Sequence, residues 1–289
     1  MKQKVKQIIV LAGPTASGKT DLAADLIKKY PLEIISADSR QVYRGLDIGS
    51  GKDKTVPQFL IDVVNPENGF TVADFKKLAE EKIEQIWQRG NTPLIVGGTG
   101  FYIEALMFDQ TTNQTPPNKS IRQKLEPLSG AELLEIIARV DAMTASKIDV
   151  NNRRRLIRAA EIISATKKPI APVSHQLRTD ARVSCFVLDV PREELYKRID
   201  KRVDDRLKIG MIEEVEHLIL AGVSKEWLVS LGLEYRAITR FLSGEVGRDE
   251  MVKQLKYDTH AFARRQISYF KRWKFAEALS KKRILNFKF

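Results

Sequence analysis

The stretch from Gly13 to Thr20 reads GPTASGKT and is the feature that most constrains the fold. It satisfies the pattern G-x-x-x-x-G-K-[ST] of a phosphate-binding loop. An apolar run from Ile8 to Ala12 precedes it, and apolar residues recur at helical spacing after it. A strand, a loop and a helix in this order form the context in which the pattern is specific. We therefore predict an α/β fold with this loop at the carboxyl end of a parallel strand.

Each residue of the loop is a candidate phosphate ligand: Gly13, Pro14, Thr15, Ala16, Ser17, Gly18, Lys19 and Thr20. Backbone N–H groups can bind phosphate oxygens, Lys19 can reach the outer phosphate, and the Thr20 hydroxyl can ligate Mg²⁺. Nucleotide-binding and ATP-binding enzymes share this pattern. An organic diphosphate presents the same oxygens, so the loop alone does not identify the ligand.

Periodicity elsewhere extends this fold. Short apolar runs at 33–36, 94–96 and 183–190 predict buried strands, and Thr71 can cap a helix before the second of them. Strands that alternate with helices predict a P-loop NTPase-like parallel sheet with helices on both faces.

A different pattern occupies the middle of the chain. Residues 121–170 show helical periodicity only, and a polar, proline-bearing stretch at 109–120 leads into them. We therefore expect a catalytic core made of residues 1–112 and 181–289. Between them we expect an all-helical insertion at 113–180.

Composition favours a polyanionic partner. The formal net charge is +12 and the pI is near 9.6. The single cysteine, Cys185, lies in an apolar run and is expected to be buried, without a second thiol for a disulfide or a zinc site. The apolar run near the N-terminus is too short for a signal peptide. We expect a cytoplasmic protein without a membrane segment.

Asp38 follows the second predicted strand, so it should lie at the same sheet edge as the phosphate loop. A kinase could use a carboxylate there to accept the proton of a hydroxyl group. An aspartate in this position could also serve only to cap a turn. The residues alone leave both interpretations open.

Longer blocks are more specific. The loop is followed by DSRQVYRGLDIGSGK at 38–52 and VGGTGFYIEAL at 96–106, and later by NNRRRLIRAAEII, LYKRIDKRVDDRLKIGMIEEV and FARRQISYFKRW. In sequence and in order, these blocks closely resemble the tRNA dimethylallyltransferase family, also called isopentenyl-diphosphate:tRNA transferases. The resemblance spans nearly the whole chain. No zinc-finger extension follows Trp273, which favours the bacterial type.

The resemblance implies a reaction. A dimethylallyl group would pass from dimethylallyl diphosphate to N6 of adenosine 37, next to the anticodon of tRNA, giving N6-(dimethylallyl)adenosine. The loop and Mg²⁺ would hold the diphosphate, with Lys19 and Thr20 neutralising its charge. Asp38 matches the family's general base, and Arg202 matches an arginine at the diphosphate end.

The helix that carries Arg202 supplies an independent observation. Arg198, Arg202 and Arg206 are spaced four residues apart and should share one face. Acidic residues interleave with them, which is typical of an ordinary solvated helix. The spacing therefore supports a phosphate-facing role without establishing it.

The resemblance also implies which residues contact tRNA. They are Asp38, Ser39, Arg40, Gln41, Thr99, Arg122, Arg154, Arg155, Leu156, Ile157, Arg158, Arg264, Arg265 and Gln266. Arginines at the start of the NNRRR helix suit RNA phosphates, although an exposed, asparagine-capped helix is the simpler interpretation. The family recognises anticodon loops with adenosines at positions 36, 37 and 38, and we expect the protein to act as a monomer.

Three segments depart from the family pattern: Ser50 to Asp53, Pro57 to Phe59, and Leu233 to Arg236. None of them includes Asp38 or the phosphate loop. The departures therefore bear on tRNA recognition more than on the type of reaction.

Other functions remain open at this point. An adenylate isopentenyltransferase would alkylate a free nucleotide, but it would not need the helical insertion or the basic charge. A P-loop small-molecule kinase would need lid arginines, and no constellation of this kind is evident. A non-catalytic RNA-binding or nucleotide-sensing protein would not need Asp38 and Lys19 to be intact.

Overall fold

The structure is a computed structural model that describes residues 6–108, 115–171 and 176–287. The chain divides into two compact units, one formed by Met1–Met107 with Arg178–Phe289 and the other by Phe108–Leu177. The second unit overlaps the insertion that we expect at 113–180. The polar connection at 109–120 lies partly outside the described residues.

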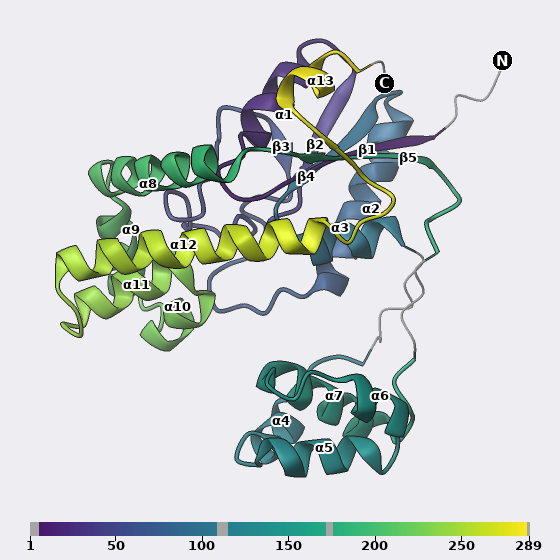
Figure 1. Ribbon diagram of the computed structural model, residues 1–289, viewed down its shortest axis with the longest axis vertical. Coiled ribbons are helices and arrows are strands. Elements are labelled where there is room, and N and C mark those ends of the chain that lie inside the picture. Colours follow the sequence, from purple (N-terminus) through teal and green to yellow (C-terminus); the bar gives the residue numbers. More distant parts are fainter. Residues whose placement is uncertain (1–5, 109–114, 172–175, 288–289) are drawn as a thin grey trace. The chain divides into compact units, whose positions relative to one another are not determined.

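A parallel sheet forms the centre of the first unit (Figure 1). Within the described residues its strands follow the order β3-β2-β4-β1-β5-β6, and every adjacent pair is parallel. The strands are β1 (Gln7–Ala12), β2 (Leu32–Ser36), β3 (Gln58–Phe59), β4 (Thr92–Gly97), β5 (Arg182–Leu188) and β6 (Glu277–Leu279). The predicted fold class is confirmed, and the short edge strands β3 and β6 are the ones that the sequence pattern did not predict.

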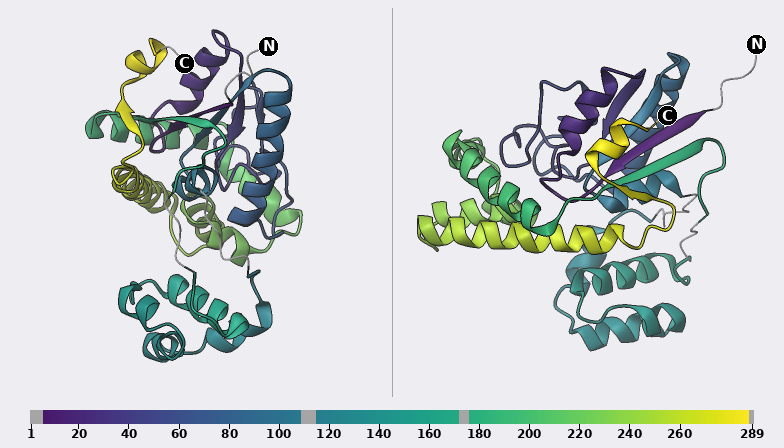
Figure 2. Two further views of the ribbon diagram at one scale, coloured as in Figure 1. Left: turned by 90° about the vertical axis from the view of Figure 1, so that its right-hand side faces the viewer. Right: turned by 45° about the horizontal axis from the view of Figure 1, so that its top comes forward.

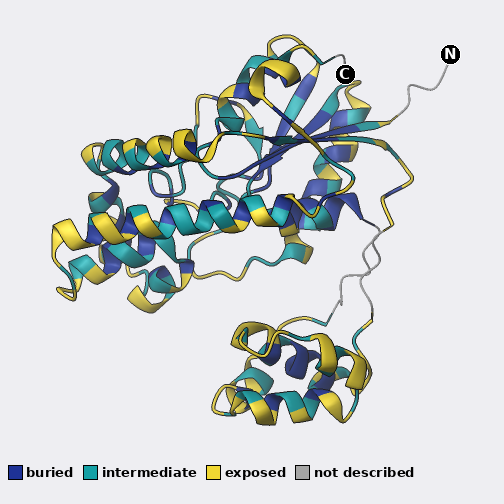
Figure 3. Cartoon of the chain, viewed as in Figure 1, coloured by how far each residue is buried: buried dark blue, intermediate teal, exposed yellow. Residues whose placement is uncertain are grey.

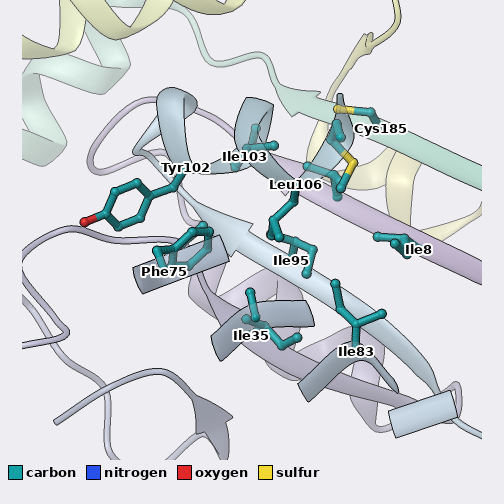
Figure 4. Close-up of a cluster of buried hydrophobic side chains, with 14 of the residues drawn as sticks. Ile8, Ile35, Phe75, Ile83, Ile95, Tyr102, Ile103, Leu106 and Cys185 are labelled. Atoms are coloured by element: carbon teal, nitrogen blue, oxygen red, sulfur yellow. The ribbon is translucent and has the colours of Figure 1, made fainter. Parts of the chain in front are cut away.

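Alternation along β1 explains why helices cover both faces of the sheet. Ile8 and Val10 pack with α2 (Val72–Gln88) and α3 (Gly100–Met107), whereas Ile9 and Leu11 pack with α1 (Lys19–Ile27). Figure 4 shows the first of these cores, in which Cys185 also lies. Because all adjacent strands are parallel, the loops that follow them lie at one edge of the sheet.

Five further helices belong to the same unit: α8 (Arg192–Lys208), α9 (Met211–Leu220), α10 (Lys225–Leu231), α11 (Leu233–Leu242) and α12 (Arg248–Phe270). Together with the segment after β2 they bury a core of their own, which includes Val42, Leu46 and Tyr235. The helices α8 and α12 lie side by side in both Figure 1 and Figure 2. The chain then returns to the sheet through β6 and α13 (Lys281–Leu285).

The second unit is a small helical bundle of α4 (Lys119–Leu125), α5 (Gly130–Ala138), α6 (Ala142–Lys147) and α7 (Arg153–Thr166). Its buried residues form one hydrophobic cluster. Figure 3 shows buried and exposed residues along the same helices. Asn152 caps α7 by accepting a hydrogen bond from the backbone of Arg155. Within the described part of this unit, all the elements longer than a single bridge are helices, in keeping with the helical periodicity of residues 121–170.

One carboxylate, Glu161, is fully buried in this bundle. It accepts hydrogen bonds from the backbone N–H of Asn118 at 2.7 Å, from Arg122 at 2.9 Å and from Arg158 at 2.8 Å. Burial alone would raise the pKa of Glu161, but these three donors hold it below its ordinary value. The carboxylate thus ties α4 to α7.

Within the described residues, no helix is both long enough and apolar enough to cross a membrane.

We predict that Glu161→Leu destabilises the helical bundle by about 2 kcal/mol. A buried pair that loses one partner costs about 3–5 kcal/mol, but Arg122 and Arg158 are partly exposed and can regain water. Hydrogen exchange of the α7 amides in the full chain measures this effect. The matched control is Glu135→Leu, which removes an exposed ion pair with Arg139 and should change protection by less than about 0.5 kcal/mol. Equal effects of the two substitutions would contradict a structural role of Glu161.

Candidate active site

The phosphate loop joins β1 to α1 and leaves the start of α1 open. Gly18 precedes the helix with a φ of 86°, and no side chain caps the helix there. The N–H groups of its first turn therefore lack intrahelical partners and can bind an anion. Gly13 is needed for a different reason, since a Cβ at this position would lie 3.1 Å from the side chain of Leu188 in β5.

Lys19 folds back over the loop. Its Nζ donates to the carbonyl oxygens of Gly13 at 2.9 Å and Pro14 at 2.7 Å, and to Ser17 Oγ at 3.4 Å. Burial of the ammonium lowers the pKa of Lys19 to about 7, helped by the charge of Arg202 and opposed by that of Asp38. Arg202 and Asp38 thus both lie close enough to influence the ionisation of Lys19.

Two arginines of α8 contact the phosphate loop, and Arg202 is far less exposed than Arg198. Arg198 donates to the carbonyl of Ser17 at 3.3 Å, and Arg202 donates to Thr15 Oγ1 at 2.6 Å. Burial, followed by the charge of Arg206, lowers the pKa of Arg202 to about 10, so this residue remains a cation at neutral pH. Its Nε is buried and has no hydrogen-bond acceptor in the part of the chain that the structure describes.

Asp38 uses its two carboxylate oxygens differently. Oδ1 accepts hydrogen bonds from the backbone N–H of Arg40 at 2.8 Å and of Gln41 at 3.3 Å. The turn-capping role is therefore real. Among the described residues no hydrogen bond involves Oδ2, so this oxygen is available to accept a proton.

The segment around Asp38 is fastened to the loop after β4. The backbone N–H of Thr99 donates to Ala37 O at 3.3 Å, and Thr99 Oγ1 accepts from the backbone N–H of Ser39 at 3.2 Å. Gln41 accepts from Ser36 Oγ at 2.8 Å. The predicted residues Asp38, Ser39, Gln41 and Thr99 thus come together at one sheet edge, and the side chain of Arg40 donates to the carbonyl of Leu231.

Gln266 lies between this loop and the phosphate loop. Its Oε1 accepts from the backbone N–H of Thr15 at 2.8 Å, and its Nε2 donates to Gly98 O at 2.9 Å. The residue is only 7% exposed. The family resemblance placed Gln266 among the residues expected to contact tRNA. A polar residue on an amphipathic helix gives no local sign that its partners are backbone groups of distant loops.

Residues in the segments that depart from the family pattern also form ion pairs and hydrogen bonds within the protein. Lys52 is buried and donates to Asp47 at 2.9 Å and Asp62 at 2.6 Å. Tyr235 is buried too and donates to Glu214 at 3.0 Å.

Glu214 in turn fastens the segment that follows the Asp38 turn. Its carboxylate accepts from the backbone N–H groups of Asp47, Ile48 and Gly49. The sequence pattern did not single out Glu214, whose importance follows from contacts with residues about 165 positions earlier in the chain. It marked Lys52 only as part of a segment that departs from the family pattern. Gln58 and Phe59, in the remaining departure, form β3.

The predicted RNA residues of the second unit differ in exposure. Arg154 and Arg155 are exposed at the start of α7. Arg122 and Arg158 are engaged by Glu161, and Ile157 is half-buried. Leu156 is fully buried in the core of the bundle, so its side chain cannot contact RNA there.

On α12 the predicted residues face different ways. Arg264 donates to the hydroxyl of Tyr196 at 3.0 Å, whereas Arg265 is exposed. A shallow depression of about 520 Å³ lies along this helix. It is lined by Ala261, Arg264, Arg265, Ser268, Tyr269 and Arg272. An arginine-rich surface of this kind suits phosphate groups.

Comparison with known proteins supports one family. The IPP transferase family model matches residues 41–273, and the isopentenyl transferase model matches residues 6–58. The chain is 40% identical to tRNA dimethylallyltransferase 1 of Citrifermentans bemidjiense over 277 residues, covering 93% of this chain and 90% of the relative. It is also 40% identical to the tRNA dimethylallyltransferase of Acetivibrio thermocellus, covering 92% and 88%.

Solved structures agree in fold. The tRNA isopentenylpyrophosphate transferase of Bacillus halodurans is 32% identical with a TM-score of 0.72, covering 98% of this chain and 95% of that protein. A eukaryotic dimethylallyltransferase acting on tRNA has a TM-score of 0.80 at 24% identity, covering 96% and 74%, and this likeness concerns the fold alone. Together with the matches along the sequence, these findings establish that the chain belongs to the tRNA dimethylallyltransferase family.

Proposed function

We propose that this protein transfers a dimethylallyl group from dimethylallyl diphosphate to N6 of adenosine 37 in tRNA. The observation that carries the proposal is the meeting of three elements at one sheet edge. They are an open helix N-terminus, the cations Lys19 and Arg202, and a carboxylate at Asp38. A diphosphate leaving group needs the first two, and a weakly nucleophilic amine benefits from the third.

The diphosphate would lie on the phosphate loop. The N–H groups of the first turn of α1 would bind its oxygens, with Lys19 and Arg202 supplying positive charge. Because the Lys19 ammonium is now held by loop carbonyls, it would exchange these partners for phosphate oxygens.

Mg²⁺ fits this arrangement if the substrate supplies part of its ligand shell. The described residues contain no group of three or more His, Cys, Asp or Glu side chains that could hold a metal by themselves. Mg²⁺ commonly binds through one or two protein oxygens, substrate phosphates and water, and the Thr20 hydroxyl is placed to be such a ligand. Bound there, the ion would neutralise charge on the departing diphosphate.

Chemistry would take place at Asp38. As the bond between the N6 nitrogen and the dimethylallyl carbon forms, the bond from that carbon to the diphosphate oxygen breaks. The amine proton passes to Asp38 Oδ2, while Oδ1 keeps the turn in place through Arg40 and Gln41. Lys19 and Arg202 stabilise the negative charge that develops on the leaving group.

Access to N6 requires adenosine 37 to leave its stack in the anticodon loop, at a cost of a few kcal/mol. Ser39, Arg40, Gln41 and Thr99 surround Asp38 and would contact the displaced base and its neighbours. Recognition of adenosines 36 to 38 would follow from these contacts. The protein would act as a monomer in the cytoplasm.

Two exposed arginine groups would bind the RNA backbone. Arg154 and Arg155 begin α7 in the helical bundle, and Arg264 and Arg265 line the depression on α12. We assign Arg122 and Arg158 partly to the support of the bundle, because both hold Glu161. An enzyme that acts on free nucleotides or a kinase is not favoured, since relatives covering about nine-tenths of the chain are named tRNA enzymes.

We predict that Asp38→Asn lowers single-turnover transfer by about 10²- to 10⁴-fold. Asparagine keeps an oxygen that can accept from Arg40 and Gln41, so the turn should survive and only the base is lost. Binding of an anticodon stem-loop should stay within a few-fold of wild type. Asp38→Ala is the companion variant, which loses the turn as well and should also weaken RNA binding. Unchanged transfer by the asparagine variant would exclude Asp38 as the base.

We predict that affinity for dimethylallyl diphosphate falls more steeply with pH in the wild type than in Lys19→Met. Lys19 has a free-state pKa of about 7, and a bound diphosphate should raise this pKa because it favours the charged form. Binding therefore takes up a proton, and the Lys19 contribution is full below pH 7 and declines above it. Calorimetric titrations between about pH 6 and 9 measure both slopes, and the variant corrects for ionisation of the phosphate itself. Parallel slopes would rule out titration of Lys19.

We predict that the double variant Arg154→Ala, Arg155→Ala binds an anticodon stem-loop more weakly and with a shallower dependence on salt. Each lost phosphate contact should reduce the slope of log K against log salt by about 0.7 to 0.9. Filter binding at several salt concentrations gives the slope. Arg139→Ala is the control, because Arg139 is exposed in the same bundle and pairs with Glu135. A slope unchanged by the double variant would assign these arginines to a solvated surface.

A further inference from the structure

Gln266 belongs to a sequence block whose neighbours face outward, but its own side chain faces inward. Arg265 and Ser268 on the same helix are exposed, whereas Gln266 is 7% exposed. Both ends of its amide are engaged, by Thr15 on one side and Gly98 on the other. A side chain in this position has little surface left for a tRNA nucleotide.

The two partners require an amide at this position. The backbone N–H of Thr15 can only donate, so it must meet the oxygen of Gln266. The carbonyl of Gly98 can only accept, so it must meet the NH₂ group. A glutamate has the same shape but no N–H to offer Gly98, and an apolar side chain satisfies neither group.

Gly98 is shaped for this contact. A Cβ at Gly98 would lie 2.5 Å from Gln266 Nε2, which is closer than a real Cβ atom comes to such a group. Any other residue at this position would push the amide away from the carbonyl. The hydrogen bond between Gln266 and the Gly98 carbonyl therefore depends on glycine at position 98.

Thr15 is the residue of the phosphate loop that Gln266 contacts. Its backbone N–H is held by Gln266 and its hydroxyl by Arg202, at 2.8 Å and 2.6 Å. These contacts hold the first half of the loop from two sides. They leave untouched the N–H groups at the start of α1, which can bind a phosphate.

The other hydrogen bond of Gln266, to Gly98, connects it with the segment that carries Asp38. Gly98 is followed by Thr99, whose hydroxyl accepts from Ser39 and whose N–H donates to Ala37. Gln266 thus connects the loop that would hold the diphosphate with the segment that carries the base.

We infer that Gln266 is a positioning residue that holds the phosphate loop at a set distance from the Asp38 segment, and that it does not contact tRNA. This inference rests on the proposed function for the identity of the substrates. The contacts of Gln266, however, are made with the phosphate loop itself, whatever the substrates are. Pyrophosphate with Mg²⁺ can therefore serve as a probe that needs neither tRNA nor catalysis.

Two variants test the inference in the full chain. Gln266→Met removes both hydrogen bonds without adding charge, and Gln266→Glu keeps only the acceptor for Thr15. Each should weaken pyrophosphate binding about tenfold, the size of effect expected when one or two hydrogen bonds are lost. Each should leave the affinity for an anticodon stem-loop within about twofold. Calorimetry for the first ligand and filter binding for the second give these values.

Arg265→Met is the matched control, because it removes an exposed polar side chain from the neighbouring position. It should show the opposite pattern, with weaker RNA binding and unchanged pyrophosphate binding. Unfolding without ligands confirms that each variant is folded, and Gln266→Glu serves if the methionine variant is not.

The outcomes separate the two proposals. Weaker RNA binding with unchanged pyrophosphate binding would overturn the inference and make Gln266 an RNA contact. Equal losses for both ligands would also overturn it, because they would indicate general damage to the fold. If the wild type transferred no dimethylallyl group but both Gln266 variants still lost pyrophosphate affinity, the proposed function would fail and the role of Gln266 in the loop would stand.

Discussion

The close approach of Gly97 to Ala37 is the constraint on which the candidate active site depends. A Cβ on Gly97 would lie 2.2 Å from the carbonyl oxygen of Ala37, so only glycine lets the ends of β2 and β4 come this near. The contact allows Ala37 to donate to Val96 O and to accept from Thr99. Because the segment after β2 begins at this point, the place of Asp38 beside the phosphate loop follows from the absence of one side chain.

Positive charge is in excess at the sheet edge that carries the phosphate loop. Lys19, Arg202 and Arg206 lie near two carboxylates, Asp38 and Glu234, and the closeness of like charges contributes to lowering the pKa of the first two. Such a cluster is unfavourable without a polyanion, since cations that have lost water repel one another. A ligand with several negative charges relieves the repulsion, which explains why this edge suits a diphosphate better than a neutral compound.

Local sequence patterns predicted the parts of the fold that depend on local structure. The apolar run of β1 and the capping residue Thr71 could be recognised in the sequence because their physical causes lie within a few residues. The spacing of the α8 arginines likewise predicts a shared face, but not which face. The edge strands β3 and β6 are too short for a periodic signal, and their pairing with β2 and β5 depends on the register of the whole sheet.

The roles of Gln266 and Glu214 lie beyond such patterns. Gln266 meets a partner 251 residues earlier in the chain, and Glu214 meets backbone groups about 165 residues earlier. A polar residue on a helix is usually solvated, so only the tertiary structure distinguishes these two from their neighbours. Leu156 shows the reverse case, because a block that the family resemblance assigns to RNA contact includes a residue that is buried in the core of the bundle.

The folded-back position of Lys19 has a consequence for how a substrate arrives. The Lys19 side chain donates to the carbonyl groups of Gly13 and Pro14, so the backbone of the loop itself supplies acceptors for this group. Binding of a diphosphate would then be a substitution, in which phosphate oxygens replace the carbonyl oxygens around Lys19. The phosphate loop would lose little conformational entropy when the diphosphate binds. Discrimination between ligands would depend on which of them can outcompete the backbone carbonyl groups for Lys19.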